Sequence, residues 1–290
     1  MPELPEVETV RAGLAEYLTG AQVTSVEVLD SRSLKRHQPG VQDFVSVMTG
    51  ATLKHMSRRG KFLWIPLDRD GLAMVGHLGM SGQMLVRDAG SEPDKLTRVI
   101  LFATAPSGKK LEMRFVDQRI FGSLAVDQLV AIEHDERIPS TVTHIARDPL
   151  DPNFDDVAVI KKLRSRTAGI KKVLLDQGVL SGVGNIYADE ALWRAKLHCD
   201  QPANSLTLPK TKELLGHVRE ILAAAVLVGG TSFDEQYKNV NGQSGYFEVS
   251  LNAYGMTGRP CPRCGKAIVR ENWMNRGSHF CPKCQKRSVS

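Results

Sequence analysis

The first residues of the chain have the types and the order that covalent catalysis by an amine would need. Removal of Met1 would leave Pro2 as a secondary amine at the end of the chain. An α-amino group titrates near ~8 and a lysine near ~10.4, so around neutral pH the terminal amine is unprotonated, and hence nucleophilic, far more often. Amines that attack sugar or carbonyl carbons form Schiff bases. Glu3 and Glu6 lie beside Pro2 in the sequence, where a carboxyl group could transfer protons.

The same segment can also be a plain helix start, and both interpretations stay open at this point. Proline is tolerated in the first helical turn, and the helix dipole favours carboxylates there. If Met1 is retained, the Pro2 nitrogen is an amide and the covalent chemistry is blocked. A helix is predicted over residues 5–18, because Gly20 follows a set of apolar residues that share one helix face: Val7, Val10, Leu14 and Leu18.

Four cysteines near the other end have the spacing of a zinc site. Cys261 and Cys264 form one CxxC pair, and Cys281 and Cys284 form a second pair after sixteen intervening residues. Four thiolates give the closed tetrahedral cage of structural zinc, which leaves no open position for chemistry. The alternative is two disulfides, but the N-terminus lacks the features of a signal peptide, which indicates a reducing cytosol. Cys199 is left over as a free thiol.

Length and composition fit a globular protein of two domains. The chain has 290 residues, of which 42% are hydrophobic and 24% charged. The longest apolar stretch, residues 221–228, is too short to span a membrane. We expect a cytoplasmic monomer with no membrane partner.

Positive charge is concentrated in the second half, where 20 Lys and Arg residues face 13 Asp and Glu residues. Residues 161–172 hold six basic residues and no acid, and residues 259–290 hold eight basic residues against Glu271 alone. Each cluster by itself could be a solvated surface. Together with a zinc module they indicate a polyanionic partner, and nucleic acid is the partner that fits best.

The hydrophobic pattern predicts an α+β protein. After the first helix, β-branched and apolar segments separated by Gly, Asp and Pro predict a β-sandwich or barrel, with strands over 21–30, 51–67, 72–87, 97–105 and 109–117. Residues 135–156 are polar and contain several prolines, and are expected to be a linker. Helices are predicted afterwards, over 156–165, 169–177, 185–196 and 209–228.

The segment Ser181-Gly182-Val183-Gly184-Asn185 lies between two of these helices. It does not fit a dinucleotide-binding fingerprint, since no strand precedes it and the third glycine is absent. It could bind a phosphate, with glycines that allow close approach, Asn185 as the helix cap and Lys171 within reach. The simpler alternative is a glycine-rich connection without a ligand.

Six motifs in the same order make the chain resemble the formamidopyrimidine-DNA glycosylases, which remove oxidised purines from DNA. These motifs are MPELPEVET at 1–9, HLGMSG at 77–82, DQRIFG at 117–122, GVGNIYADEAL at 182–192, GYF at 245–247, and the zinc pattern. The resemblance covers essentially the whole chain. It implies an N-terminal catalytic β-sandwich with flanking helices (1–134), the linker (135–156), a helix-two-turn-helix DNA-binding domain with a lesion-capping loop (157–250) and a β-hairpin zinc finger (251–290).

The resemblance also implies the chemistry and the partner, which is double-stranded DNA that contains an oxidised purine or an abasic site. The Pro2 nitrogen would attack the sugar and form a Schiff base, with Glu3 as acid and base. β- and δ-elimination would then cut the strand, and Glu6 would support the pocket. One structural Zn²⁺ is implied at the four cysteines.

By the same resemblance, several side chains would hold the DNA. Lys61, Lys171, Asn185 and Arg276 would contact phosphates, and Lys61 would thereby serve the catalytic site. Met80, Arg119 and Phe121 would fill the gap left by the flipped nucleotide, with Arg119 on the orphaned cytosine. Gln118 and Ile120 stand where such proteins often have proline and arginine.

Two other function classes remain open from the sequence. An enzyme similar to endonuclease VIII would share Pro2 and Glu3 but act on oxidised pyrimidines, and Leu4 and the HLGMSG segment argue against it. A catalytically silent DNA-binding zinc protein would use only the phosphate contacts and the finger. Whether Met1 is removed and the Pro2 amine is free distinguishes such a silent binding protein from an active enzyme. An active enzyme would work in the bacterial cytoplasm, at the nucleoid.

Overall fold

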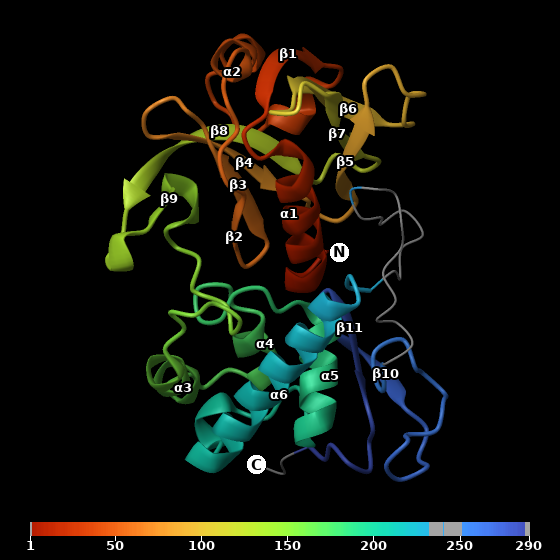
Figure 1. Ribbon diagram of the computed structural model, residues 1–290. Helices are drawn as coiled ribbons and strands as arrows, with labels where there is room; N and C mark the ends of the chain where they lie inside the picture. Colours follow the sequence, from red (N-terminus) through yellow and green to blue (C-terminus); the bar gives the residue numbers. More distant parts are fainter. Residues whose placement is uncertain (1, 232–239, 241–250, 288–290) are drawn as a thin grey trace. The chain divides into compact units, whose positions relative to one another are not determined.

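The computed structural model describes residues 2–231, 240 and 251–287 (Figure 1). The chain divides into two compact units. The first comprises Met1–His144 and Gly229–Tyr246, and the second comprises Ile145–Val228 and Phe247–Ser290. None of the described helices is both long and apolar enough to cross a membrane.

The first unit is built on two antiparallel sheets. One sheet has the order β1-β6-β7-β5, with β1 Gln22–Val28, β5 Gly82–Asp88, β6 Thr97–Thr104 and β7 Lys110–Asp117. The other has the order β2-β3-β4-β8-β9, with β2 Ser57–Arg59, β3 Phe62–Pro66, β4 Leu72–His77, β8 Ser123–Ala131 and β9 Arg137–Pro139.

One apolar core joins the two sheets. Leu63 and Met74 from the five-stranded sheet and Val99 and Met113 from the four-stranded sheet belong to the same buried cluster. Helix α1 (Leu4–Leu18) adds its apolar face, including Leu14, and contacts β2, β3 and β5. Helix α2 (Val41–Met48) lies against β1 and β8, and short 3-10 helices cover Ser31–Leu34, Glu133–Asp135 and Ser140–Val142. The expected β-sandwich with flanking helices is confirmed.

The second unit is helical and ends in a β-hairpin. Its helices are α3 Asp156–Arg164, α4 Ile170–Leu174, α5 Asn185–Ala195 and α6 Leu208–Leu227, with a 3-10 helix at Ala203–Ser205. Asp155 caps α3 and Thr207 caps α6 through their side-chain oxygens. The hairpin pairs β10 (Val269–Trp273) with β11 (Arg276–Phe280), and β11 contacts α5.

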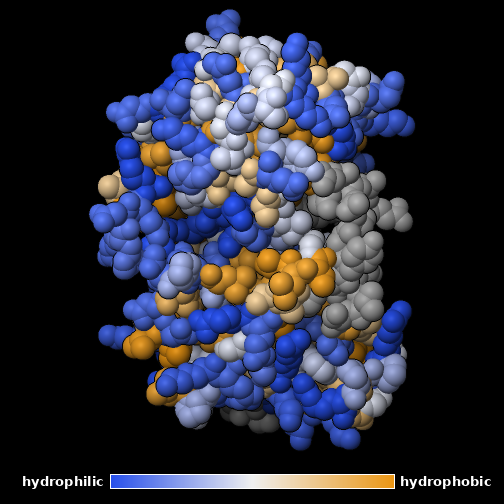
Figure 2. Space-filling view, in the orientation of Figure 1, coloured by the Kyte–Doolittle hydropathy of each residue, from blue (hydrophilic) through white to orange (hydrophobic). Residues whose placement is uncertain are grey.

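The face of the molecule drawn in Figure 2 is mostly hydrophilic, with an orange apolar area in the lower half.

Tight turns explain one difference between the predicted elements and the structure. The segments 51–67 and 72–87 each contain two strands rather than one, because Gly60 (φ 55°) and Gly79 (φ 62°) turn the chain in the left-handed region.

Other differences concern missed elements and domain boundaries. Helix α2 and strand β8 were not predicted. The expected linker 135–156 contains β9, which pairs with β8. Residues 229–231 and Val240, expected in the second domain, belong to the first unit.

A buried carboxylate fixes the segment that leads to the zinc hairpin. Glu190 on α5 is 2% exposed, and its carboxylate accepts hydrogen bonds from the backbone N–H groups of Asn252, Ala253 and Tyr254 at 2.8–3.1 Å. Burial raises the pKa of Glu190, and the backbone hydrogen bonds oppose that shift. Residues 252–254 belong to no helix or strand whose carbonyl groups could accept from their N–H groups, so the Glu190 carboxylate supplies the acceptors.

Glu190→Gln is therefore expected to destabilise the second unit. The amide side chain keeps one acceptor but presents N–H donors to backbone donors, which leaves a buried group unsatisfied at a cost of about 1–3 kcal/mol. Thermal and denaturant unfolding would measure the loss. Glu213→Gln, on the exposed side of α6, is the matched control and should change stability little. Equal stability of both variants would contradict the anchoring role.

Candidate active site

Pro2 and Glu3 are buried at the start of α1, in the first unit. Glu3 is 2% exposed and occupies the N-cap position. A reciprocal capping box joins Glu3 and Glu6: the Glu3 side chain accepts from the Glu6 backbone, and the Glu3 N–H donates to Glu6 Oε2 at 2.8 Å. The helix-start interpretation is therefore correct in structural terms, and it does not exclude chemistry, since it fixes the position of Pro2. Met1 lies outside the described residues.

Glu6 ties α1 to the segment that follows Gly229. Its Oε1 accepts from the Thr231 N–H at 2.7 Å and from Thr231 Oγ1 at 3.0 Å. Gly230 has φ +80°, and a Cβ there would lie 2.7 Å from Glu6 Oε1, so a side chain would displace the carboxylate. Glu6 thus accepts hydrogen bonds from the backbone at Glu3 and at Thr231, and so holds the start of α1 against the segment that follows Gly229.

Lys61 follows Gly60 in the turn between β2 and β3, and it is half-buried. The neighbouring arginines are used internally, since Arg58 pairs with Glu8 at 2.9 Å and Arg59 with Glu136 at 2.9 Å. Lys61 is the lysine of the RRGK segment, and an ammonium group on a flexible stem is a type of side chain that contacts phosphates.

His77, at the end of β4, was missed by the sequence analysis. Burial, followed by the charges of Arg36, Lys61 and Lys35, lowers the pKa of His77 to about 4, so the ring is neutral at pH 7. Its Nδ1 accepts from the Gly79 N–H at 3.1 Å, which places the proton on Nε2 as a donor. The signal available in the sequence was its position at the head of the HLGMSG motif.

Two loops, residues 78–81 and 118–122, are joined by the buried carboxylate of Asp117. Its Oδ1 accepts from Ser81 Oγ at 2.6 Å and from the Arg119 N–H at 3.2 Å, and its Oδ2 accepts from the Gly122 N–H at 2.7 Å. Gly79 allows close contact, since a Cβ there would lie 2.4 Å from the Phe121 carbonyl carbon. Sequence reasoning missed Asp117 and Ser81, whose role appears only when the loops meet.

The three expected wedge residues all lie on these loops. Met80 is 41% exposed and Phe121 is 50% exposed, and Arg119 is also exposed. Ile120 has φ 57°, a strained conformation for a β-branched residue, and its carbonyl accepts from Lys35 Nζ at 2.7 Å. Two large apolar side chains held in water by a buried network suit contact with a partner better than folding.

In the second unit, Asn185 is the first residue of α5 and not its cap. Gly184 occupies the N-cap position, and Asn185 Nδ2 donates to the Gly277 carbonyl at 3.0 Å. The glycine loop before α5 is shaped by Gln177, which accepts from the Gly182 N–H and donates to the Val183 carbonyl, both at 3.0 Å. Asn185 therefore lies beside the strand that begins with Arg276.

Lys171 occupies a different place from the one we expected for a phosphate contact. Its side chain is fully buried, and Nζ lies 2.6 Å from Asp189 Oδ1 and donates to the Gly277 carbonyl at 3.3 Å. Burial lowers the pKa of Lys171, and the Asp189 charge opposes that shift. Asp189 also accepts from Ser278 Oγ at 3.1 Å and from the His279 N–H at 2.9 Å. This network fastens β11 to α4 and α5.

The four cysteines form one cluster at the base of the hairpin. The Sγ atoms of Cys261, Cys264, Cys281 and Cys284 all lie within 4.8 Å of one another. Sulfurs at the corners of a tetrahedral zinc site, each about 2.3 Å from the ion, are spaced ~3.8 Å apart. The donor set therefore fits one structural zinc ion, and the disulfide alternative is not needed. Arg276 is exposed at the start of β11.

Cys199 remains a free thiol outside this cluster. It is 3% exposed, and burial raises its pKa to about 11, so it is protonated near neutral pH. A buried protonated thiol is a poor nucleophile. The GYF motif at 245–247 lies outside the described residues, as does most of the segment 231–247 that the family resemblance makes the lesion-capping loop.

Family models match three parts of the chain. Residues 1–124 match the formamidopyrimidine-DNA glycosylase N-terminal domain, and residues 145–236 match the formamidopyrimidine-DNA glycosylase H2TH domain. Residues 258–287 match the zinc finger found in FPG and IleRS. These spans contain the two loops, the glycine segment and the cysteine cluster described above.

Relatives match the chain over nearly its full length. The formamidopyrimidine-DNA glycosylase of Leifsonia xyli is 56% identical, with 99% of this chain and 100% of the relative covered. That of Salinispora arenicola is 53% identical, with 99% and 97% covered. The Lactococcus lactis Fpg, solved in complex with DNA containing an abasic site, has a TM-score of 0.84 at 31% identity, with 98% and 100% covered. The chain therefore belongs to the formamidopyrimidine-DNA glycosylase family, the DNA glycosylases of base-excision repair that also have AP lyase activity.

Proposed function

We propose that this enzyme excises oxidised purines, such as 8-oxoguanine and formamidopyrimidines, through a Schiff base on Pro2. The observation that carries the proposal is the burial of Pro2 and Glu3 at the start of α1, with Glu6 bonded to the backbone on both sides. The Lactococcus lactis relative is known in complex with abasic-site DNA, and a mutant of it in complex with Fapy-dG DNA, which supports the choice of substrate.

In this mechanism the Pro2 nitrogen bonds to the anomeric carbon, the bond from that carbon to the base breaks, and the departing base takes up the proton that the amine nitrogen loses. Glu3 supplies a proton to the ring oxygen as the sugar opens, which leaves an iminium ion. The iminium acidifies the neighbouring sugar carbon. Loss of that proton expels the 3′ phosphate, and a second elimination expels the 5′ phosphate, so the product is a one-nucleotide gap.

We assign phosphate contacts to Lys61 and His77 in the first unit and to Asn185 and Arg276 in the second. Lys61 and Arg276 supply charge, and the neutral His77 supplies its Nε2–H. Asn185 uses one amide hydrogen on Gly277 and keeps the second for a phosphate. Lys171 acts indirectly, because with Asp189 it positions the strand that carries Arg276. The site of action is chromosomal DNA in the cytoplasm.

Met80, Arg119 and Phe121 fill the gap that the flipped nucleotide leaves. Flipping costs a few kcal/mol of stacking, which an apolar side chain and an aromatic ring can replace. Arg119 can donate to the base opposite the lesion. This assignment is supported by the exposure of the three side chains and by their place on two loops that Asp117 holds together.

Borohydride should trap the enzyme covalently on DNA that contains 8-oxoguanine opposite cytosine, since the proposed intermediate is a Schiff base. Pro2→Gly keeps a terminal amine and should retain some trapping. A variant with one residue added before Pro2 moves the amine and should lose trapping. Undiminished trapping and excision by the extended variant would rule out Pro2 as the nucleophile and favour another amine. Absence of trapping and excision in the wild-type protein would favour a silent binding protein.

Loss of a zinc ligand should weaken DNA binding, because small metal sites couple metal binding to folding and this site supports the hairpin of Arg276. Cys281→Ser is expected to lower zinc content and to weaken affinity by about tenfold or more. Cys199→Ala, which removes the cysteine outside the cluster, should keep both. Zinc content by atomic spectroscopy and affinity for abasic-site DNA are the readouts. Full DNA affinity without zinc would place the hairpin outside the interface.

Arg119→Ala should mainly reduce discrimination between bases opposite the lesion. A good bidentate contact to a base contributes roughly 1–3 kcal/mol of discrimination, so the preference for cytosine over adenine should shrink by that amount. Excision rates are measured on four duplexes that differ only in the opposite base. Lys61→Ala, which removes a phosphate contact, should slow all four alike. If Arg119→Ala also slows all four equally, the residue is an anchor and not a reader.

A further inference from the structure

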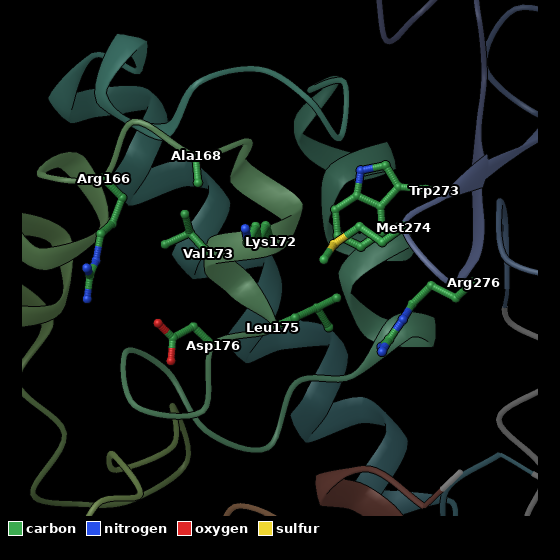
Figure 3. A pocket seen from close by; sticks show the side chains of 9 residues that line it. All are labelled: Arg166, Ala168, Lys172, Val173, Leu175, Asp176, Trp273, Met274 and Arg276. Atoms are coloured by element: carbon green, nitrogen blue, oxygen red, sulfur yellow. The ribbon is translucent and has the colours of Figure 1, made fainter.

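A cavity of about 410 Å³ lies in the second unit between α4 and the turn of the β10–β11 hairpin (Figure 3). Three exposed cations line it: Arg166, Lys172 and Arg276. Across the described residues, none of the three forms an ion pair with a carboxylate. Asp176 is the acidic lining residue, and its Oδ1 already accepts from the Gly178 N–H at 3.0 Å. Three cations against one carboxylate leave the lining with a net positive charge, so the cavity favours an anion.

The cations are separated by apolar surface. In Figure 3, Val173 and Leu175 lie between Arg166 on one side and Arg276 on the other, with Trp273 and Met274 beside them. A simple inorganic anion would gain nothing from this strip. A sugar-phosphate backbone alternates charged phosphates with the less polar faces of deoxyribose, which matches cation, apolar strip and cation in turn.

Met274 adds an independent indication that this surface meets a ligand. It is the first residue of the two-residue turn between Trp273 and Arg276, it has φ 52°, and it is 66% exposed. Glycine is favoured where φ is positive at the first central position of such a turn, so methionine is strained there. Neither backbone preference nor burial explains an exposed apolar side chain at this position.

The basic cluster at residues 161–172 also needs a new role. Lys171 is buried, Lys162 Nζ donates to the Gly178 carbonyl, and Arg164 Nε donates to the Leu206 carbonyl. Arg166 and Lys172 are the members of the cluster that line the cavity together with Arg276. Arg276, which we have assigned to a DNA phosphate, therefore lines the same cavity as Arg166 and Lys172.

We propose that this cavity is a further DNA subsite, which seats a stretch of sugar-phosphate backbone beyond the nucleotide under repair. Arg166 and Lys172 contact one phosphate, Arg276 contacts another, and Met274 packs against the intervening sugar. The proposal rests on the assignment of Arg276 to DNA and extends the interface along α4. The subsite would make the affinity of the enzyme for DNA depend on how far the duplex continues past the lesion.

The test is a set of double-mutant cycles between protein charges and single phosphates. Each duplex contains a tetrahydrofuran abasic site and one neutral methylphosphonate at a different position of the flanking backbone. Wild-type protein should lose affinity when the seated phosphate is neutralised. Arg166→Ala and Lys172→Ala should lose that sensitivity at one shared position, and the double variant should lower the slope of log K against log salt by about 0.9, because one phosphate is no longer neutralised. Met274→Gly should fold normally and weaken binding without changing the slope.

Lys212→Ala is the matched control, because Lys212 is an exposed cation of the same unit that lies at a different cavity, between α3 and α6. If Arg166→Ala and Lys172→Ala behave like Lys212→Ala while Arg276→Ala still weakens binding, the further subsite is refuted and the proposed function stands. If Arg276→Ala also behaves like the control, the assigned grip itself fails.

A second arm separates DNA from an acidic protein partner. A poly-glutamate peptide is titrated against wild type and Arg166→Ala by fluorescence anisotropy. Tight peptide binding that is lost in Arg166→Ala, with no phosphate-specific coupling in the DNA cycles, would assign the cavity to a protein and overturn the proposal. Weak binding equal in both proteins, together with phosphate-specific coupling, is the expected result.

Discussion

The buried ion pair of Lys171 and Asp189 is the interaction on which the β10–β11 hairpin of the second unit depends. It joins α4 to α5, and through Gly277, Ser278 and His279 it fixes the strand that begins with Arg276. Neither charge is tolerated alone at this depth, and removal of one partner from a buried pair typically costs about 3–5 kcal/mol. The hairpin is thus held at one end by the four-cysteine cluster and along β11 by this pair.

Buried carboxylates do the same work elsewhere in the chain. Glu6 accepts from backbone at Glu3 and Thr231, Asp117 accepts from Arg119 and Gly122, and Glu190 accepts from residues 252–254. In each case the partner is a loop that lacks the regular hydrogen bonds of a helix or sheet. A carboxylate offers several acceptor sites, so one buried side chain can satisfy two or three amides and fix the loop.

This arrangement separates the buried residues that hold the structure from the exposed residues that we propose for contact with DNA. Met80, Arg119, Phe121 and Arg276 are exposed, whereas the carboxylates of Asp117 and Asp189 are buried and each accepts several hydrogen bonds. Strain at Ile120 and Met274 lies on the same exposed loops. Strained backbone persists where surrounding contacts determine it, and it often marks sites that bind a ligand.

The sequence by itself determined much of the chemistry. The order of Pro2 and Glu3, the spacing of the four cysteines and the motif resemblance fixed the class of enzyme, and long periodic segments fixed most helices and strands. It did not separate β2 from β3 or reveal α2, because short elements carry weak periodicity. It also placed Lys171 on a phosphate, since a basic residue in a basic cluster looks exposed. Only the tertiary structure showed that Asp189 buries it, that Asp117 joins two distant loops and that His77 is neutral. These roles depend on contacts between residues far apart in the chain, and one linear pattern does not encode which polar groups will be removed from water together.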